Sequence, residues 1–153
     1  MKKIGIKWKA EHMPSQVGKT VIITGANTGI GFHMVKALAS KGADVIMACR
    51  NLEKANTART EILQALPGAS IAVEELDLAD LANIESFGQR ITKNYEHIDT
   101  LINNAGVMIP PQSTTADGFE LQIGTNHFGH FALTSHLMPL LTAAPQPRVV
   151  TLS

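Results

Sequence analysis

The first informative stretch of this chain reads Val21-Ile22-Ile23-Thr24-Gly25-Ala26-Asn27-Thr28-Gly29-Ile30-Gly31. The β-branched run Val21–Ile23 is typical of a strand that is covered on both faces of a parallel sheet. Gly25 permits a tight turn, Gly29 leaves room for a close-lying group, and Gly31 allows the following helix to lie against the strand. The free amides and the dipole at the start of that helix attract an anion. This stretch therefore predicts a cradle for the pyrophosphate of a dinucleotide.

Strand and helix patterns alternate through the rest of the chain. Short apolar runs predict further strands at 45–48, 71–76, 100–102 and 148–152. Periodic apolar residues and breakers predict one helix ending at 41–42 and others at 52–66, 80–95 and 118–141, the last bent or shortened by Pro139. This order implies an α/β fold with a doubly wound parallel sheet and helices on both faces. Such sheets bind ligands beyond the carboxyl ends of the strands, where the strand order reverses.

Composition narrows the class of protein. The 153 residues suffice for one domain, which we expect over 18–153, after an N-terminal arm at 1–17 that Trp8 and Met13-Pro14 pack against the body. Balanced charge argues against nucleic acid as the main partner, and no apolar run is long enough to span a membrane. Cys49 is the only cysteine, which fits a reducing compartment, so a cytoplasmic location is expected. Because the chain stops directly after the fifth predicted strand, the domain is expected to be incomplete at its C-terminal end.

Polar residues follow the second and third predicted strands. Arg50 stands about twenty residues beyond the glycine turn, where an acid would bind the ribose hydroxyls of NAD and an arginine accommodates the 2′-phosphate of NADP. Guanidinium is always charged and matches phosphate oxygens two at a time. The alternative is a solvated surface arginine. Asp77 is expected to accept a hydrogen bond from the adenine amino group; its alternative role is to cap the next helix, which Asp80 could supply as well.

Two further stretches carry candidate residues. Asn103-Asn104-Ala105-Gly106 follows the fourth predicted strand, where small residues leave room for a ribose and a nicotinamide and Asn104 can brace the neighbouring loop. Asn126 lies in the middle of the last predicted helix, where asparagine competes for backbone hydrogen bonds and can hold a water. His127 and His130 invite a metal interpretation, but no third ligand is evident. Helix packing or interface contacts are favoured for them, and no metal is expected.

The last predicted helix also carries two glycines. Gly124 and Gly129 indicate that another helix approaches closely, with a second subunit as one candidate. A homo-oligomer formed through this helix is therefore one expectation. Asp99 and Arg148 carry charges that could pair across loops, but solvated positions are favoured for both.

Four motifs together resemble the short-chain dehydrogenase/reductase family: Thr-Gly-x-x-x-Gly-Ile-Gly at 24–31, Asp77, Asn-Asn-Ala-Gly at 103–106, and Asn126. Cys49-Arg50-Asn51 and the segment 117–131 are similar to its retinol-dehydrogenase-like and protochlorophyllide-reductase-like branch. The resemblance implies a Rossmann fold and an NADP(H)-dependent oxidoreductase that transfers hydride between nicotinamide and a small-molecule alcohol or carbonyl substrate. It gives Asn126 the catalytic role of holding a water in a proton relay. The cofactor-binding residues expected on this basis are Gly25, Asn27, Thr28, Gly29, Ile30, Gly31, Arg50, Asn51, Asp77, Leu78, Asn104, Ala105 and Gly106.

Part of the family's chemistry is missing from this chain. Ser153 matches the first of two serines, of which the second is catalytic in the family. The Tyr-x-x-x-Lys motif is absent, because Tyr95 is the only tyrosine and no lysine stands four residues after it. Without that tyrosine there is no general acid near the right pKa. The first hypothesis is therefore that the chain is the N-terminal, cofactor-binding portion of an oxidoreductase and is inactive alone.

Two alternatives stay open. One is a complete, non-catalytic NADP-binding or interaction protein, which fits the missing tyrosine but needs a partner to cover the fifth strand and the last helix. The other is a methyltransferase, which also has a glycine turn after its first strand but normally has an acid where Arg50 stands.

Overall fold

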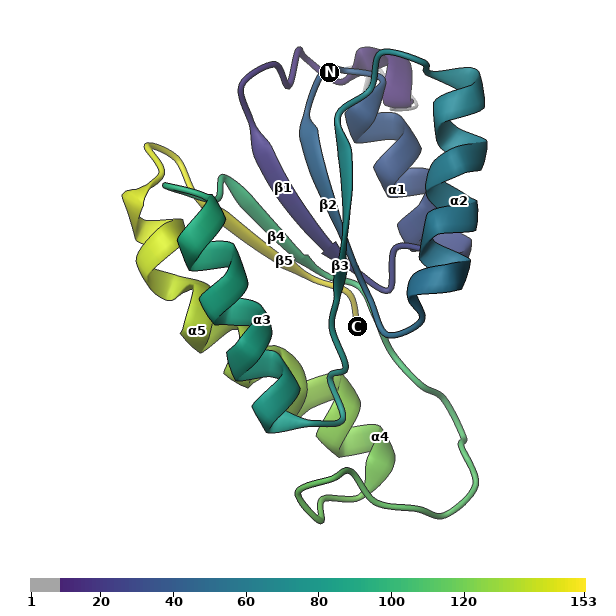
Figure 1. Ribbon diagram of the computed structural model, residues 1–153, viewed down its shortest axis with the longest axis vertical. Coiled ribbons are helices and arrows are strands. Elements are labelled where there is room, and N and C mark those ends of the chain that lie inside the picture. The colour runs from purple at the N-terminus through teal and green to yellow at the C-terminus, as the bar shows by residue number, and fades with distance from the viewer. Residues whose placement is uncertain (1–8) are drawn as a thin grey trace, which may run out of the picture.

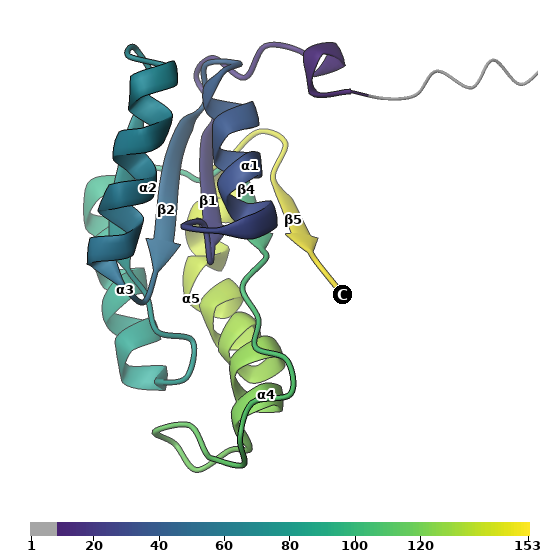
Figure 2. The same ribbon diagram turned by 90° about the vertical axis from the view of Figure 1, so that its right-hand side faces the viewer.

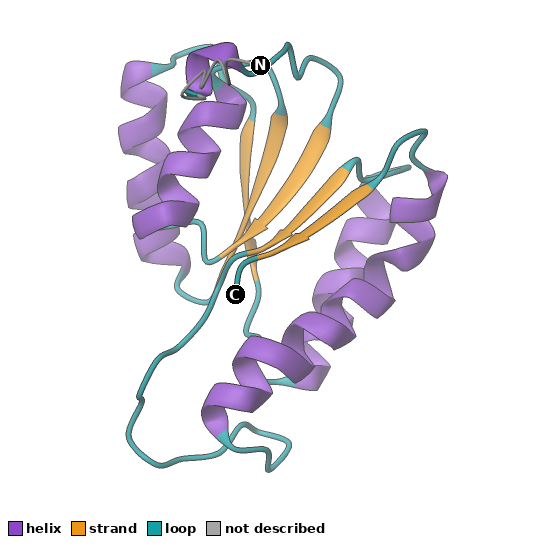
Figure 3. Ribbon diagram, turned by 180° about the vertical axis from the view of Figure 1, so that it is seen from behind, coloured by secondary structure: helices purple, strands orange, loops and turns teal. Residues whose placement is uncertain are grey.

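The sheet has the predicted parallel architecture. The computed structural model describes residues 9–153, so the expectation for Trp8 lies outside the described residues. Within that range the sheet contains five strands, all parallel to their neighbours: β1 (Thr20–Thr24), β2 (Asp44–Cys49), β3 (Ile71–Glu75), β4 (Thr100–Asn103) and β5 (Arg148–Thr151). Their spatial order is β3-β2-β1-β4-β5, so the order reverses between β1 and β4 (Figure 3).

Helices cover both faces of the sheet. α1 (Gly29–Ala39) and α2 (Leu52–Ala65) lie on one face, and α3 (Leu81–Asn94) and α5 (His130–Ala143) lie on the other (Figure 1). Because successive strand residues point to opposite faces, Val21 and Ile23 enter the first core and Ile22 enters the second. The unbroken apolar run in β1 is thus explained by two separate cores. In residues 9–153, no helix has both the length and the apolar character needed to cross a membrane.

The predicted 118–141 helix begins later than expected and is not uniform. It consists of α4 (Leu121–Ile123), a π-helical turn η2 (Gly124–Gly129) and then α5. Gly118 has a φ of +84°, which a helix cannot accommodate. Glu120 then caps the helix, since its carboxylate accepts hydrogen bonds from the amides of Gln122 (2.9 Å) and Ile123 (2.8 Å).

Two other expectations were wrong. Of the two effects expected of Pro139, shortening of the helix is wrong, because α5 continues to Ala143, and bending stays a prediction. Asp99 is not solvated: it is 2% exposed and accepts hydrogen bonds from Lys19 Nζ (2.8 Å) and the Thr20 amide (2.9 Å). Burial by itself raises the pKa of the Asp99 carboxyl, but these hydrogen bonds, together with the charges of Lys19 and His97, outweigh burial and hold the pKa below its ordinary value of 3.8. A sequence does not reveal such pairing, because the partners lie 80 residues apart.

The described part of the arm is held at the turn between α1 and β2 (Figure 2). It contains a short 3₁₀ helix, η1 (Ala10–His12). Lys41 Nζ donates to the carbonyl of Glu11 (2.9 Å), and the amide of Gln16 donates to the carbonyl of Lys41 (2.8 Å). Met13 is half-buried and Pro14 is exposed, and the hydrogen bonds to Lys41 hold this part of the arm.

Candidate functional site

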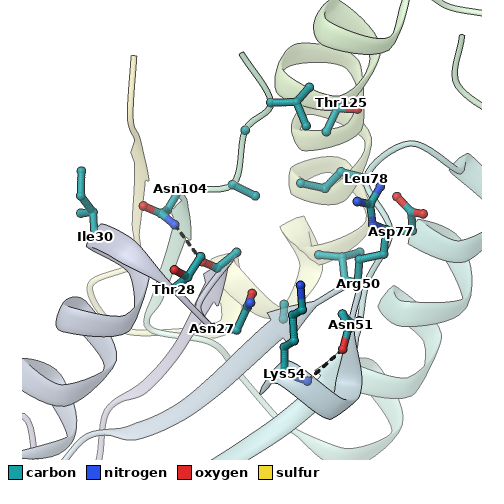
Figure 4. A pocket seen from close by; sticks show the side chains of 16 residues that line it. Asn27, Thr28, Ile30, Arg50, Asn51, Lys54, Asp77, Leu78, Asn104 and Thr125 are labelled. Atoms are coloured by element: carbon teal, nitrogen blue, oxygen red, sulfur yellow. Dashed lines mark hydrogen bonds between the residues drawn. The ribbon is translucent and has the colours of Figure 1, made fainter. Parts of the chain in front are cut away.

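A pocket of about 490 Å³ opens beyond the carboxyl ends of β1, β2 and β4, where the strand order reverses (Figure 4). We call it the switch-point pocket. It is lined by Gly25, Asn27, Thr28, Ile30, Ala48, Arg50, Asn51, Lys54, Leu76, Asp77, Leu78, Asn104, Ala105, Gly106, Val107 and Thr125. All the predicted cofactor-binding residues except Gly29 and Gly31 are among them. Segments far apart in the sequence therefore meet where the fold predicts a ligand.

The three glycines of the first turn have different surroundings. Gly25 has a φ of +63°, and a β-carbon there would lie 2.9 Å from the Cα of Ala105. Gly29 opens α1 with a φ of +55°, and a β-carbon there would meet nothing within 4 Å. Gly31 is buried, and a β-carbon there would lie 2.5 Å from the carbonyl oxygen of Gly25. Gly31 therefore packs the helix against the turn, whereas Gly29 leaves the start of the helix open to an anion.

The loop after β4 is tied to the end of β1. The Thr24 hydroxyl accepts hydrogen bonds from the amides of Asn104 and Ala105, both at 2.9 Å. Asn104 Nδ2 in turn donates to the carbonyl of Thr24 at 2.8 Å. Asn104 thus braces the neighbouring glycine turn, as predicted.

Two cations stand at one side of the switch-point pocket. Arg50 follows β2, and Lys54 lies on the first turn of α2. Among residues 9–153, no carboxylate forms an ion pair with either side chain. Asn51 caps α2, since its Oδ1 accepts from the Lys54 amide at 2.8 Å. The sequence reasoning missed Lys54, although its place in the first turn of a helix that begins at Leu52, directly after Arg50 and Asn51, was the available signal.

Asp77 does not cap the next helix. Asp80 does so, by accepting a hydrogen bond from the amide of Ala82 at 2.9 Å. Asp77 Oδ1 accepts from the amide of Ala79 at 2.9 Å, and its other oxygen has no hydrogen-bond partner among the described residues. The alternative capping role of Asp77 is therefore wrong, and one carboxylate oxygen stays available in the pocket.

Thr125 is a lining residue that the sequence reasoning did not single out. Its hydroxyl oxygen is buried and finds no partner within residues 9–153. Its position directly before Asn126 was the available signal. The apolar lining residues Ala48, Leu76 and Val107 also went unpredicted, because the direction of a side chain depends on strand pairing and loop geometry.

Asn126 lies in the π turn and not on the pocket wall. Its Oδ1 accepts from the Val107 amide, and its Nδ2 donates to the Val107 carbonyl, both at 2.8 Å. A β-carbon at Gly106 would lie 3.3 Å from Asn126 Oδ1. The side chain therefore clamps the loop after β4, and the predicted disturbance of the helix coincides with the π turn, a feature often found at functional sites.

The two histidines of this helix lie in different environments. His130 is 4% exposed, with Nε2 2.9 Å from Thr24 Oγ1 and Nδ1 2.9 Å from the Asn126 carbonyl oxygen. Burial lowers the pKa of His130 below its ordinary value of 6.5, against the opposing effect of that carbonyl. His127 is exposed and packs edge-on against Phe128. The part of the chain that the structure describes contains no group of three or more His, Cys, Asp or Glu side chains able to hold a metal.

We expect the free energy of unfolding to decrease as the pH falls below about 6.5. The pKa of His130 is lower in the folded than in the unfolded protein, so the unfolded chain takes up its proton first. The neutral ring therefore stabilises the fold above pH 6.5 or so, and acidification removes that stability. Urea unfolding at about pH 7.5 and about pH 5.5 measures the change, which reaches about 1.4 kcal/mol per pH unit at most. His130→Gln should flatten the profile; an equal slope in the variant contradicts the assignment.

The close contacts at Gly124 and Gly129 are made within this chain. A β-carbon at Gly124 would meet the side chain of Thr115, and one at Gly129 would meet the carbonyl of Leu78. The expected approach of another helix is wrong, because Thr115 and Leu78 both lie in loops of this chain, whereas the expected homo-oligomer stays a prediction.

The fold and the pocket together define a Rossmann-type domain of the class that binds dinucleotides. Residues 19–153 match the family model described as short chain dehydrogenase. The chain belongs to the short-chain dehydrogenase family, which supports binding of a nicotinamide cofactor and confirms the predicted resemblance.

Relatives and solved structures agree with this family. Retinol dehydrogenase 13 of Mus musculus is 46% identical over 136 residues, which cover 89% of this chain and 41% of that protein. Retinol dehydrogenase 11 of Homo sapiens is also 46% identical, over 89% of this chain and 43% of that protein. The chain thus spans about two fifths of the length of these relatives. The predicted similarity to the retinol-dehydrogenase-like branch is confirmed.

Two crystal structures illustrate the structural similarity. A protein from Mycobacterium paratuberculosis has a TM-score of 0.77 and 45% identity, covering 87% of this chain and 46% of that chain. A short chain dehydrogenase from Escherichia coli complexed with NADPH has a TM-score of 0.77 and 27% identity, covering 90% of this chain and 60% of that chain.

Proposed function

We propose that this chain binds NADP(H) in the switch-point pocket and forms the cofactor-binding half of an oxidoreductase. That enzyme transfers hydride between the nicotinamide and an alcohol or carbonyl carbon of a small-molecule substrate. One observation carries the proposal: a single pocket is surrounded by the open start of α1, by Arg50 and Lys54, which form no ion pair within residues 9–153, and by the small-residue loop 104–106.

The residues present fit the chemical parts of the cofactor. The pyrophosphate binds at the amides of the 25–31 turn, where the helix dipole favours negative charge. The adenosine lies near Asp77 and Leu78, and the nicotinamide lies beside 104–106. Asp77 and Thr125 each have a polar oxygen without a protein partner among the described residues. The Thr125 oxygen is buried and favours a polar ligand, because a buried polar group without a hydrogen bond costs free energy.

Charge favours NADP over NAD. Arg50 and Lys54 line the pocket, and neither forms an ion pair with a carboxylate of residues 9–153. The 2′-phosphate of NADP adds charge that these two cations can neutralise, whereas NAD carries a hydroxyl at that position.

The proposed enzyme needs more than this pocket. Bound nicotinamide would supply or accept the hydride, and we assign Asn126 to the proton relay from the family resemblance, since its side chain holds the loop after β4 beside the pocket. The Tyr-x-x-x-Lys pair is absent from the sequence of this chain. We therefore expect the chain to bind the cofactor without turnover, with 18–153 as the cofactor domain and 1–17 as an arm. Of what the names of the relatives state, we propose for this chain only the class of reaction, which is dehydrogenation.

The direct test is titration of the purified chain with NADPH and with NADH, followed by fluorescence or calorimetry. The proposal expects saturable NADPH binding, clearly tighter than NADH binding. Absence of binding by both cofactors at millimolar concentration contradicts it. S-adenosylmethionine serves as the third titrant, and preferential binding of that molecule would favour a methyltransferase instead.

Thr125→Val is expected to weaken NADPH binding about threefold to tenfold, because the variant cannot form one hydrogen bond to the cofactor. Its free energy of unfolding should be unchanged or higher, since the hydroxyl has no protein partner within residues 9–153. Thr92→Val is the matched control, on α3 and outside the pocket. Unchanged NADPH affinity in Thr125→Val would contradict this contact.

A second candidate is a non-catalytic NADP-binding protein, which would use the same pocket. Both candidates expect NADPH binding and no hydride transfer by this chain alone. The sequence encoded beyond Ser153 separates them, because only the oxidoreductase requires a Tyr-x-x-x-Lys motif there. A homo-oligomer through α5 is a further expectation that sedimentation analysis can test.

A further inference from the structure

His130 lies where three segments of the fold meet. It is the first residue of α5, follows the π turn directly, and reaches the end of β1. Its ring is 4% exposed. The sequence favours helix packing or an interface for this histidine, and the structure shows both of its ring nitrogens engaged inside the chain.

The hydrogen bonds determine which nitrogen carries the proton. Nδ1 faces the carbonyl oxygen of Asn126 at 2.9 Å, and a carbonyl oxygen can only accept, so Nδ1 donates. In the neutral ring Nε2 must then accept, and the group facing it at 2.9 Å is the Thr24 hydroxyl. Thr24 Oγ1 already accepts from the amides of Asn104 and Ala105. Its own hydrogen is therefore free to point at Nε2.

The competing acceptor for that hydrogen is weaker. The carbonyl oxygen of Ile102 lies 3.5 Å from Thr24 Oγ1, against 2.9 Å for His130 Nε2. With the Nδ1–H tautomer, every donor has an acceptor, and Thr24 uses its hydrogen and both lone pairs. The chain of hydrogen bonds runs from the Asn126 carbonyl through the ring and the Thr24 hydroxyl to two amides that line the switch-point pocket.

We propose that His130 is a positioning residue that orients the Thr24 hydroxyl and thereby holds the Asn104–Ala105 backbone in the conformation that receives the nicotinamide end of the cofactor. The statement about the cofactor rests on the proposed function; the statement about the backbone does not. Without the ring, the Thr24 hydroxyl loses its best acceptor and can rotate. The loop then populates other arrangements, and apparent affinity falls with the fraction of molecules that stay competent.

Two substitutions test the hydrogen bonds of the two ring nitrogens separately. His130→Asn places an amide nitrogen near the position of Nδ1, so it can keep the bond to Asn126 but cannot reach Thr24. His130→Gln places an amide oxygen near the position of Nε2, so it can keep the bond from Thr24 but not the one to Asn126. A role confined to filling space would also favour His130→Gln over His130→Asn, because asparagine is the smaller side chain and leaves the larger void. His130→Leu is therefore the control, since leucine fills about as much space as glutamine but accepts no hydrogen bond from Thr24. If orientation of the Thr24 hydroxyl matters, His130→Leu should behave like His130→Asn; if only volume matters, it should behave like His130→Gln.

The first measurement is amide hydrogen exchange of Asn104 and Ala105 in the chain without cofactor. His130→Asn should accelerate exchange about tenfold or more, and His130→Gln should stay within about threefold of the wild type. The second measurement is NADPH titration, in which His130→Asn should bind about tenfold more weakly and His130→Gln should bind nearly as the wild type. Nitrogen NMR of the wild-type histidine, which needs no variant, should find the proton on Nδ1.

The outcomes are distinguishable. A proton on Nε2, equal exchange in both variants, or equal loss of affinity in both overturns the positioning role. If the wild type does not bind NADPH, the proposed function fails, while the exchange rates and the tautomer still decide what His130 does to the loop. If exchange separates the variants but NADPH affinity does not, His130 orders the loop without positioning the cofactor, and the proposal is wrong.

Discussion

Arg50→Ala should weaken NADPH binding about tenfold or more and leave NADH binding nearly unchanged. Arg50 lines the switch-point pocket and forms no ion pair with any carboxylate of residues 9–153. A charge-assisted hydrogen bond contributes about 1.5–3 kcal/mol, which corresponds to roughly tenfold to a hundredfold in affinity. NADH lacks the 2′-phosphate, so it loses nothing when the guanidinium is removed. Calorimetric titration of wild type and variant with both cofactors measures the difference.

Arg148→Ala is the matched control for Arg50→Ala. It removes the same charge from an exposed arginine at the start of β5, at the opposite end of the sheet. It should change neither affinity. Lys54→Ala should weaken NADPH binding less than Arg50→Ala, because an ammonium does not form the paired contacts of a guanidinium. Equal losses for NADPH and NADH in Arg50→Ala would mean that Arg50 supports the structure of the pocket and does not select the cofactor.

Among glycine-to-alanine substitutions in the first turn, Gly31→Ala is expected to destabilise the protein most. The added β-carbon would lie 2.5 Å from the carbonyl oxygen of Gly25 and 2.7 Å from Asn104 Nδ2. The clash is with backbone on one side and with the amide that braces the turn on the other, so the helix must move. We expect a loss of about 1–3 kcal/mol in the free energy of unfolding, as for overpacked cores. NADPH binding should also weaken.

Gly68→Ala is the control for added volume at a glycine. A β-carbon there meets nothing within 4 Å, and the residue has no positive φ. Its stability should change little or increase slightly, because alanine restricts the unfolded chain. Urea unfolding of both variants provides the comparison. A Gly31→Ala protein as stable as Gly68→Ala would show that the helix can shift at no cost, and the tight packing argument would fail.

Sequence reasoning worked best where one local pattern had one structural outcome. The run Val21–Ile23 and the glycines after it predicted a buried strand, a turn and a helix start, and β1 and α1 have that form. The last helix was less predictable. Glu120 caps its start, and its π turn contains Asn126, whose side chain pairs with Val107; neither contact is visible in apolar periodicity.

The sequence by itself determined the alternating elements, the parallel sheet and the residues that would meet at its carboxyl edge, because these follow from short-range apolar spacing and from where each strand ends. Only the tertiary structure decided which oxygens are left without partners. Asp80 caps α3, whereas Asp77 faces the pocket. Asp99 is buried beside Lys19. The His130 ring forms a hydrogen bond with the Thr24 hydroxyl. The physical reason is that hydrogen-bond partners are chosen by proximity in space. Thr24 and His130 are 106 positions apart in the chain and 2.9 Å apart in the fold.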